Sequence, residues 1–385
     1  MSVVAKPKIS EVQKFVHNLL TDTMHKKRQD SLADAAFGLM NSETLRLHQL
    51  GEGLARAKNL KKKHATKQID RLLSNKKFTI WDIASSWVPY VIGCRTKIYV
   101  ALDWTSFAKD GQETICINLI TTHGRATPLL WKTVNKTQLK HNRGRYEDQL
   151  LSRLKECIPA DVDVTIIADR GFASYKFFEF IEKDLKFKYI IRIKASTTVI
   201  SNKNTVKKAT EWLAKDGHAR NIKQAKLTKQ AFPVEQVIVC KEKNMKAPWI
   251  IVTNDKGLKT KEIINLYAKR WKIEPYFRDI KDKRFGFGLS DTHILSAERR
   301  DRLLFIVAIA YVLMTILGAA GEAIGFDRLL KVNTVKTRTH SLIRQGMFYY
   351  AFFDNFSPQD KQNLLDKFQN LLQEQSVFQE IFFVI

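Results

Sequence analysis

The spacing of hydrophobic and polar positions along the chain changes near residue 96. Before that point, apolar residues follow helical spacing, as over 45–54 and 69–73. After it, apolar and polar residues alternate over 98–103, which is typical of a half-buried strand. The pattern therefore predicts a helical region over 1–92, followed by a region that contains a sheet.

Further apolar runs extend the second pattern. Four of them read as strands, over 116–120, 128–131, 162–168 and 188–193. Helical spacing indicates helices over about 146–157 and 175–184. Three strands followed by helix, strand, helix and strand predict an α/β fold with a mixed sheet and flanking helices.

Two later segments depart from that pattern. Residues 195–247 are polar and Lys-rich, with one strand indicated over 234–240, and we interpret them as an insertion. The apolar run over 249–253 is expected to lead back into the sheet, and a long helical pattern begins at Lys259. Leucines and a phenylalanine at helical spacing over 364–372 predict an amphipathic helix that packs against the rest of the molecule.

The segment 303–320 contains no charged residue and is at the lower limit of length for a membrane span. The alternative is a helix buried in a large core. We expect the buried helix, because a single span late in an otherwise soluble and highly basic chain is difficult to explain.

The charge balance restricts the class of partner. The chain has 65 Lys and Arg against 39 Asp and Glu, a net charge of +26. Such an excess predicts a polyanionic partner, nucleic acid before an anionic membrane surface. Basic residues concentrate over 56–77, where the candidates for DNA contact are Lys61, Lys62, Lys63 and Arg71, although a solvated helix face would have the same composition.

The cysteines and the first residues bear on the compartment. The four cysteines lie far apart and form no C-x-x-C pair, so neither a disulfide framework nor a zinc cluster is indicated. The first fifteen residues lack the apolar segment of a signal peptide. We therefore expect a cytoplasmic protein.

Two acidic residues follow apolar strands. Asp103 ends the strand predicted over 98–103, and Asp169 directly follows the strand over 162–168. Each alone would be an ordinary strand-end residue, but sites in open α/β sheets form at the carboxyl ends of strands. Carboxylate oxygens suit Mg²⁺ or Mn²⁺ better than zinc, so the pair predicts a site for a hard divalent cation.

A third acidic residue lies in the helical pattern over 266–282. If this segment is one straight helix, Tyr267, Arg270, Glu274 and Lys281 fall within an arc of about 60° on one face. A carboxylate flanked by two cations and a phenol suits a phosphate backbone held beside a metal ligand. The alternative is a solvated face with an Arg270–Glu274 pair.

The spacing Y-x2-R-x3-E-x6-K in this segment resembles the signature of the insertion-sequence-four family of DDE transposases. The resemblance extends in the same order over most of residues 40–340. Pro275, directly after Glu274, departs from it and predicts a kink or interruption of the helix. The segments similar to the family, and in particular to the branch that contains the transposon-ten transposase, are KQIDRLLSN (67–75), ALDWT (around Asp103), HGRATPL (123–129), IIADRGF (around Asp169), APWIIVTN (247–254) and SAERRDRLL (296–304).

The resemblance implies a domain organisation. The family has an RNase H-like catalytic core, with a β-containing insertion between the second and third acidic residues. The implied segments are a helical DNA-binding domain (1–92), the first part of the core (93–194), the insertion subdomain (195–255), the second part of the core (256–325) and a C-terminal helical region (326–385).

The resemblance also implies a reaction. Asp103, Asp169 and Glu274 would be the catalytic, metal-binding triad for two Mg²⁺ (or Mn²⁺) ions. The reaction would be cut-and-paste transposition, in which phosphoryl transfer cleaves transposon ends and joins their 3′ ends to target DNA.

Roles for further residues follow from the same resemblance. Tyr267, Arg270 and Lys281 would contact phosphates near the transposon end. The transposon-ten branch cleaves through hairpinned ends, which requires a distorted terminal base, and Trp271 or Phe172 would supply the stacking surface. Either aromatic residue could instead belong to the core.

The implied partners are double-stranded DNA, as terminal inverted repeats and target, and a second copy of the chain in the paired-end complex. We expect no membrane association and a nucleoid-associated protein in a bacterial cytoplasm. The alternatives are a catalytically inactive DNA-binding protein, an RNase H-like nuclease without strand transfer, and, more remotely, a membrane-surface protein.

Overall fold

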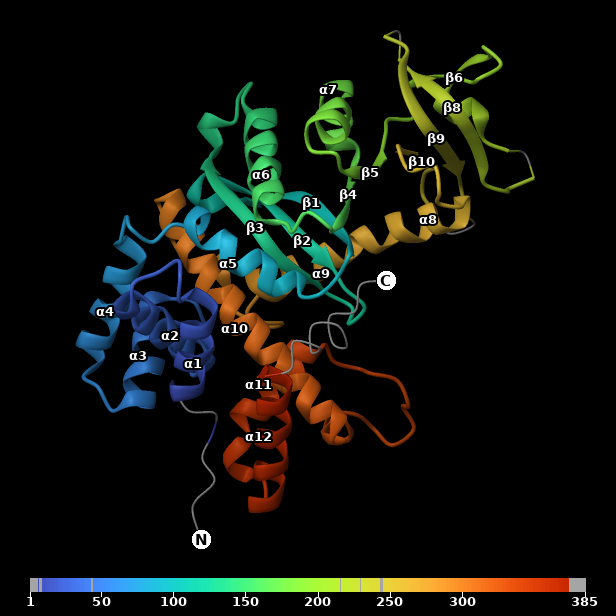
Figure 1. The fold of residues 1–385 in the computed structure, drawn as a ribbon. Coiled ribbons are helices and arrows are strands. Elements are labelled where there is room, and N and C mark those ends of the chain that lie inside the picture. The colour runs from blue at the N-terminus through green and yellow to red at the C-terminus, as the bar shows by residue number, and fades with distance from the viewer. Residues whose placement is uncertain are drawn as a thin grey trace.

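The computed structural model describes residues 6, 9–42, 44–214, 216–228, 230–242 and 245–373. Its strands are β1 Lys97–Phe107, β2 Gln112–Ile120, β3 Ala126–Asn135, β4 Asp163–Ala168, β5 Lys188–Arg192, β6 Thr198–Ile200, β7 Val206–Lys208, β8 Arg220–Leu227, β9 Phe232–Cys240 and β10 Trp249–Thr253. Within the described residues these form one mixed sheet in the order β3-β2-β1-β4-β5-β10-β9-β8-β6-β7 (Figure 1).

The middle of the sheet confirms the strands expected from alternation over 98–103 and from the later apolar runs. β1 pairs antiparallel with β2 and parallel with β4, and β4 pairs parallel with β5. β10 is antiparallel to both β5 and β9, so the strand expected to lead back lies between them.

The segment interpreted as an insertion contains more structure than its sequence indicated. Besides β9, it forms β6, β7 and β8, and all of them continue the central sheet. The pattern hid them because every residue of β7 is exposed and β8 buries only three of its eight residues.

The N-terminal region is helical, as expected, and consists of α1 Ile9–Leu20, α2 Lys26–Met40, α3 Leu47–Lys58, α4 Lys62–Ser74 and α5 Ile80–Ile92. α2 packs against α1, α3 and α10 (Ala297–Ala323), and α5 packs against β3. In Figure 1 the helices α1–α4, in blue, and the strands β6–β9 lie at opposite ends of the molecule.

The remaining helices flank the sheet or follow it. They are α6 Arg143–Cys157, α7 Tyr175–Glu179 with a π-helical continuation Phe180–Asp184, α8 Thr260–Lys269, α9 Ile273–Lys281, α11 Leu342–Ala351 and α12 Pro358–Gln373. The expected tail helix is α12, and it buries Leu364, Phe368 and Leu371. The architecture is a mixed α/β fold consistent with an RNase H-like core.

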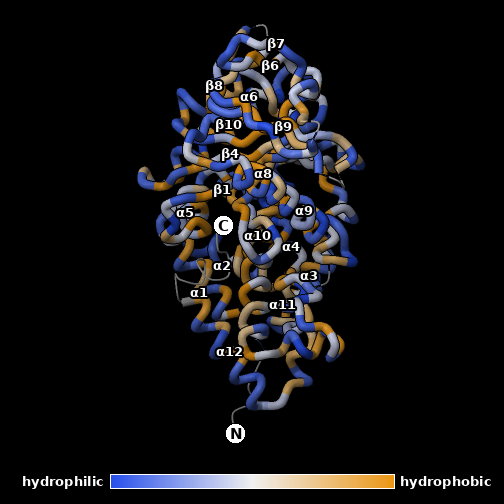
Figure 2. Tube along the Cα trace, turned by 90° about the vertical axis from the view of Figure 1, so that its right-hand side faces the viewer, coloured by the Kyte–Doolittle hydropathy of each residue, from blue (hydrophilic) through white to orange (hydrophobic). Residues whose placement is uncertain are grey.

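α10 contains the uncharged segment and is buried, as expected. It is long and apolar enough to cross a membrane, but 94% of its most apolar stretch is buried inside the molecule. It contacts β3, α2, α11 and α12. Figure 2, coloured by hydropathy, shows α10 in the interior of the molecule. Because it is apolar on all sides, it suits a position between the sheet and the helical regions.

Candidate active site

The register of the sheet brings the first two acidic residues together. Leu102 in β1 is paired with Ala168 in β4, so Asp103 and Asp169 follow on neighbouring parallel strands. β1 does not end at Asp103, however, but continues to Phe107 because it remains paired with β2. Asp103 therefore lies beside the end of β4, the parallel neighbour of β1. The Oδ1 atom of Asp169 accepts a hydrogen bond from the Gly171 amide at 2.7 Å.

The third acidic residue comes from a helix that is interrupted. α8 ends at Lys269, a 3-10 turn spans Arg270–Lys272, and α9 begins at Ile273. The expectation of a single helical face is therefore wrong, whereas the interruption predicted from Pro275 is confirmed. Pro275 lies in the first turn of α9, where its missing N–H group leaves no hydrogen bond unmade.

Arg270 connects two of the three carboxylates. Its Nη1 atom lies 3.2 Å from Oδ2 of Asp103, and its Nη2 atom lies 3.6 Å from Oε1 of Glu274. The side chains of Arg270 and Asp103 are 12% and 22% exposed, so their contact is partly shielded from solvent, whereas Glu274 is 40% exposed. The interrupted helix thus places Glu274 facing the strand that carries Asp103.

The electrostatics of Asp103 reflect this clustering of charge. Burial, and to a smaller extent the neighbouring carboxylates of Asp169 and Glu274, raise the pKa of Asp103 to about 6. The Arg270 guanidinium and the Trp104 amide, which donates to Oδ1 at 2.9 Å, oppose that shift. Three acidic groups therefore act on one another, and a cation among them would be stabilised.

Tyr267 and Lys281 lie on either side of the interruption. Tyr267 is buried against Trp249, with ring centroids 5.0 Å apart. The Nζ atom of Lys281 donates to the Thr105 hydroxyl at 2.6 Å and to a neighbouring carbonyl on β1. Lys281 thereby fixes α9 against β1.

The two aromatic candidates have different environments. Phe172 is 4% exposed and packs against Phe177, with ring centroids 5.8 Å apart. Trp271 lies in the 3-10 turn next to Arg270 and is 63% exposed. The structure therefore leaves only Trp271 of these two available for stacking.

The donor chemistry fits a hard divalent cation. The three candidates are carboxylates, two from adjacent strands and one from α9, and oxygen ligands are those that Mg²⁺ and Mn²⁺ prefer. Among the described residues, however, no group of three His, Cys, Asp or Glu side chains is arranged to hold a metal ion. In this arrangement the Arg270 guanidinium supplies the positive charge between Asp103 and Glu274.

Sequence reasoning missed two polar contacts beside the site. Lys272 donates to the Thr121 carbonyl at 2.6 Å, and the Trp104 indole donates to Glu147 on α6 at 2.8 Å. Trp104 lies in the ALDWT segment that was singled out, but nothing in the sequence around Glu147 distinguishes it from its acidic neighbours.

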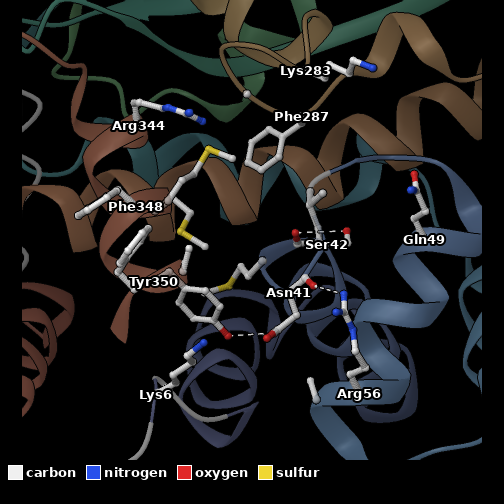
Figure 3. A pocket seen from close by; sticks show the side chains of 18 of the residues that line it. Lys6, Asn41, Ser42, Gln49, Arg56, Lys283, Phe287, Arg344, Phe348 and Tyr350 are labelled. Atoms are coloured by element: carbon white, nitrogen blue, oxygen red, sulfur yellow. Dashed lines mark hydrogen bonds between the residues drawn. The ribbon is translucent and has the colours of Figure 1, made fainter. Parts of the chain in front are cut away.

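A separate cavity of about 920 Å³ lies where the N-terminal helices meet α10 and α11. Figure 3 shows its polar wall, where the Asn41 amide donates to the Tyr350 hydroxyl at 2.8 Å and Arg56 donates to the Asn41 carbonyl. None of the three acidic candidates lines this cavity.

Comparison with known proteins identifies a family for most of the sheet-containing region. The family model described as "Transposase DDE domain" matches residues 99–313, more than half of the 385-residue chain. The matched span contains Asp103, Asp169 and Glu274. No curated protein matches the chain. The chain belongs to the transposase DDE domain family, whose members are transposases that act on DNA and depend on a divalent metal.

Proposed function

We propose that this protein is a cut-and-paste DNA transposase of the insertion-sequence-four family. It would bind transposon ends, cleave them by metal-dependent phosphoryl transfer and join the 3′ ends to target DNA. The observation that carries the proposal is the position of Asp103 and Asp169 on neighbouring parallel strands, with Glu274 connected to Asp103 through Arg270. The family match includes all three residues.

Asp103, Asp169 and Glu274 are the catalytic residues in this proposal, and they would hold two Mg²⁺ or Mn²⁺ ions. The ions, when bound, activate the attacking oxygen and stabilise the leaving one. In the metal-free protein, Arg270 neutralises Asp103 and Glu274. The metal ions would take its place when they bind. Arg270 would then be released to contact DNA phosphate.

Tyr267, Lys281 and Trp271 complete the proposed contacts with the transposon end. Tyr267 is buried and Lys281 is half-buried, so they would reach phosphate only at the floor of the site. Trp271 is exposed beside Arg270, which supports it as the surface on which a displaced terminal base stacks during hairpin formation.

For the DNA-binding region we propose a helix–turn–helix formed by α3 and α4. Only Asn59–Lys61 separate these helices, and Asn59 has a left-handed φ of 52°. The two helices approach closely at Gly51. An added Cβ atom there would lie only 2.1 Å from the Thr66 hydroxyl. In such motifs the second helix enters the major groove of DNA.

The exposed face of α4 supports this assignment. Lys63, Lys67 and Arg71 line a groove of about 890 Å³ together with Arg28, and no acidic residue lines it. Lys61 is also exposed, whereas Lys62 is paired with a glutamate of α3 at 2.6 Å.

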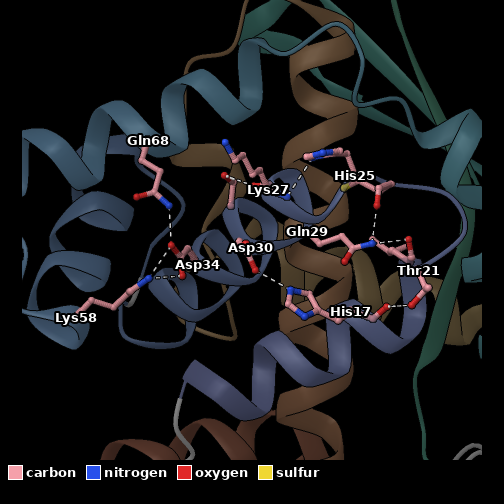
Figure 4. Close-up of polar contacts among 12 residues, drawn as sticks. His17, Thr21, His25, Lys27, Gln29, Asp30, Asp34, Lys58 and Gln68 are labelled. Atoms are coloured by element: carbon pink, nitrogen blue, oxygen red, sulfur yellow. Dashed lines mark hydrogen bonds and ion pairs between the residues drawn. The ribbon is translucent and has the colours of Figure 1, made fainter.

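A buried carboxylate holds the two helices in place. Asp34 on α2 is 4% exposed and accepts hydrogen bonds from Lys58 of α3 at 2.8 Å and from Gln68 of α4 at 2.6 Å (Figure 4). Asp34 therefore fixes the orientation of α4 relative to α2 and α3.

The remaining parts of the proposal rest on the resemblance to the family. They are a homodimer that pairs two transposon ends, and a cytoplasmic location in association with the nucleoid. The net charge of +26 is consistent with a polyanionic partner in that location.

The test is to incubate purified protein with Mg²⁺ and DNA that carries the terminal repeats flanking its own gene. We expect excised DNA and joined products, and their loss when EDTA is added. Asp103→Ala, Asp169→Ala and Glu274→Ala should each lower cleavage by at least about 10³-fold, about 4 kcal/mol of activation free energy, while DNA binding is retained. Asp161→Ala, at an exposed position before β4, is the matched control and should cleave normally.

The alternatives give other results. A DNA-binding protein without activity would bind the ends but leave them uncut. A nuclease without strand transfer would cut them and join none. Normal cleavage by any variant of the triad would overturn the assignment of the catalytic residues.

A further inference from the structure

A buried glutamate lies behind the proposed catalytic site and has no role in the mechanism above. Glu147, in the first half of α6, is 7% exposed. Its Oε1 atom accepts a hydrogen bond from the indole N–H of Trp104 at 2.8 Å. Burying a carboxylate is costly, and the hydrogen bond from the indole offsets part of that cost.

Trp104 connects this glutamate with the catalytic strand. It directly follows Asp103 in β1, and its backbone amide donates to Oδ1 of Asp103 at 2.9 Å. Because successive side chains of a strand point to opposite faces, the indole extends away from the face that Asp103 presents to Arg270. One residue thus holds the Asp103 carboxylate with its amide and is itself anchored by its side chain.

The indole is fixed on more than one side. The guanidinium of Arg143, at the start of α6, lies over its ring at 4.7 Å from the centroid. Arg143 is also 3.8 Å from Glu113 on β2. Glu147 further lies close enough to Asp169 that this carboxylate contributes to raising the pKa of Glu147, although burial is the larger cause.

We infer that Glu147 is a positioning residue, which orients the Asp103 carboxylate by holding the Trp104 indole from the opposite face of the sheet. The inference rests on the proposed function, because it treats Asp103 as a catalytic metal ligand. Outer-shell hydrogen bonds of this kind typically change metal affinity or activity 10–100-fold when they are removed.

The experiment compares substitutions that keep or remove the single hydrogen bond. Glu147→Gln retains an oxygen that can accept from the indole, and Glu147→Leu does not. Trp104→Phe removes the donor but keeps an aromatic ring and the backbone amide. The control is Glu156→Leu, on the same helix but exposed.

Two quantities are measured for each variant. The first is Mn²⁺ affinity of the protein without DNA, followed by electron paramagnetic resonance of the free ion. The second is the single-turnover rate of cleavage of its own transposon ends. Glu147→Leu and Trp104→Phe should weaken both by about 10–100-fold, whereas Glu147→Gln and the control should stay within about threefold of the wild type. The double variant Glu147→Leu/Trp104→Phe should be no worse than Trp104→Phe alone, because both changes remove the same bond.

Each other outcome overturns the inference. Glu147→Gln as impaired as Glu147→Leu would mean that the charge acts and not the hydrogen bond. Additive losses in the double variant would mean that the two residues act independently, as would normal behaviour of Trp104→Phe. If Glu147→Leu does not fold, Trp104→Phe alone tests the inference. A wild-type protein that neither binds Mn²⁺ nor cleaves would overturn the proposed function as well, whereas an active wild type with an unimpaired Glu147→Leu would overturn only this inference.

Discussion

Arg270 contacts both Asp103 and Glu274, two of the carboxylates that we propose as metal ligands. Arg270→Ala leaves these two carboxylates facing each other without a cation. We expect the metal-free variant to lose about 1.5–3 kcal/mol of unfolding free energy, because hydrogen bonds to charged groups contribute that much. Mg²⁺ should then raise the unfolding temperature of the variant by more than it raises that of the wild type.

Calorimetry with and without Mg²⁺ measures both effects. Lys269→Ala, which changes the preceding cation, is the control and should respond to Mg²⁺ like the wild type. An equal Mg²⁺ response in Arg270→Ala would show that the arginine and the ions do not compete for the same carboxylates.

Asp301, in the first turns of α10, should make stability depend on pH. Burial raises its pKa to about 7, against the hydrogen bond that its Oδ1 atom accepts from the Thr133 amide at 2.9 Å. Between about pH 4 and pH 7, the folded state therefore keeps a proton on Asp301 that the unfolded chain has lost. This group consequently favours the folded state most at low pH. That stabilisation is lost as the pH rises from about 4 to about 7.

Asp301→Asn removes the titrating group but keeps the oxygen that accepts from Thr133. We expect the variant to gain stability relative to the wild type at pH 8, and to gain less at pH 5, in urea unfolding at the two values. Asp291→Asn, at an exposed position, should show the same difference from the wild type at both. A pH-independent effect of Asp301→Asn would contradict the raised pKa.

At the scale of elements, the crossing of α10 and α11 depends on two glycines. A Cβ atom on Gly346 would lie 1.9 Å from the Met314 carbonyl oxygen, and one on Gly318 would lie 1.9 Å from the Leu342 carbonyl oxygen. Gly346→Ala must therefore separate the helices, and we expect a loss of about 1–3 kcal/mol, the usual cost of overpacking.

Urea unfolding measures this loss. Gly144→Ala is the matched control, because Gly144 lies in the first turn of α6 with no atom within 4 Å of the added Cβ. It should be neutral or slightly stabilising, since alanine restricts the unfolded chain. A harmless Gly346→Ala would mean that the two helices can move apart without cost.

Elements with a clear period or a long apolar run could be predicted from the sequence, and those with neither could not. β1 alternates and α10 is uncharged over several turns, so both were identifiable. β7 is exposed at every position and lacks any alternation. Its place in the sheet depends on pairing with β6, which is information held by another segment of the chain.

The candidate site divides in the same way. Asp103 and Asp169 were conspicuous in the sequence because each is a charged residue next to a predicted apolar strand, whereas Glu274 was proposed from the helical pattern over 266–282 and the family resemblance. The contact between Arg270 and Asp103 could not be predicted, because it joins segments 167 residues apart. The contact between Glu147 and Trp104 likewise depends on how α6 packs against the sheet.

For the whole molecule, the charge predicts a strong salt dependence of DNA binding. If Lys63, Lys67 and Arg71 of α4 contact phosphates, the logarithm of affinity should fall with the logarithm of salt concentration by about 0.9 for each contact. Replacing all three by alanine should flatten that slope by up to about three. Fluorescence anisotropy over a salt series measures it.

The control is a triple variant of exposed lysines outside α4, with Lys183, Lys256 and Lys336 changed to alanine. It should leave the slope close to that of the wild type. If the α4 variant keeps the wild-type slope, the lysines of α4 form an ordinary solvated face.

The position of β10 between β5 and β9 has a consequence for synthesis on the ribosome. β5 ends at Arg192, but its partner β10 begins only at Trp249. At the usual 5–20 residues per second, the edge of β5 remains open for roughly 3 to 12 s while the intervening strands emerge. An unpaired edge of apolar strand is a template for wrong partners, so a nascent chain stalled in this interval is expected to depend on chaperones. Translation speed over 193–253 should therefore influence the yield of folded protein more than the same change made over 1–92.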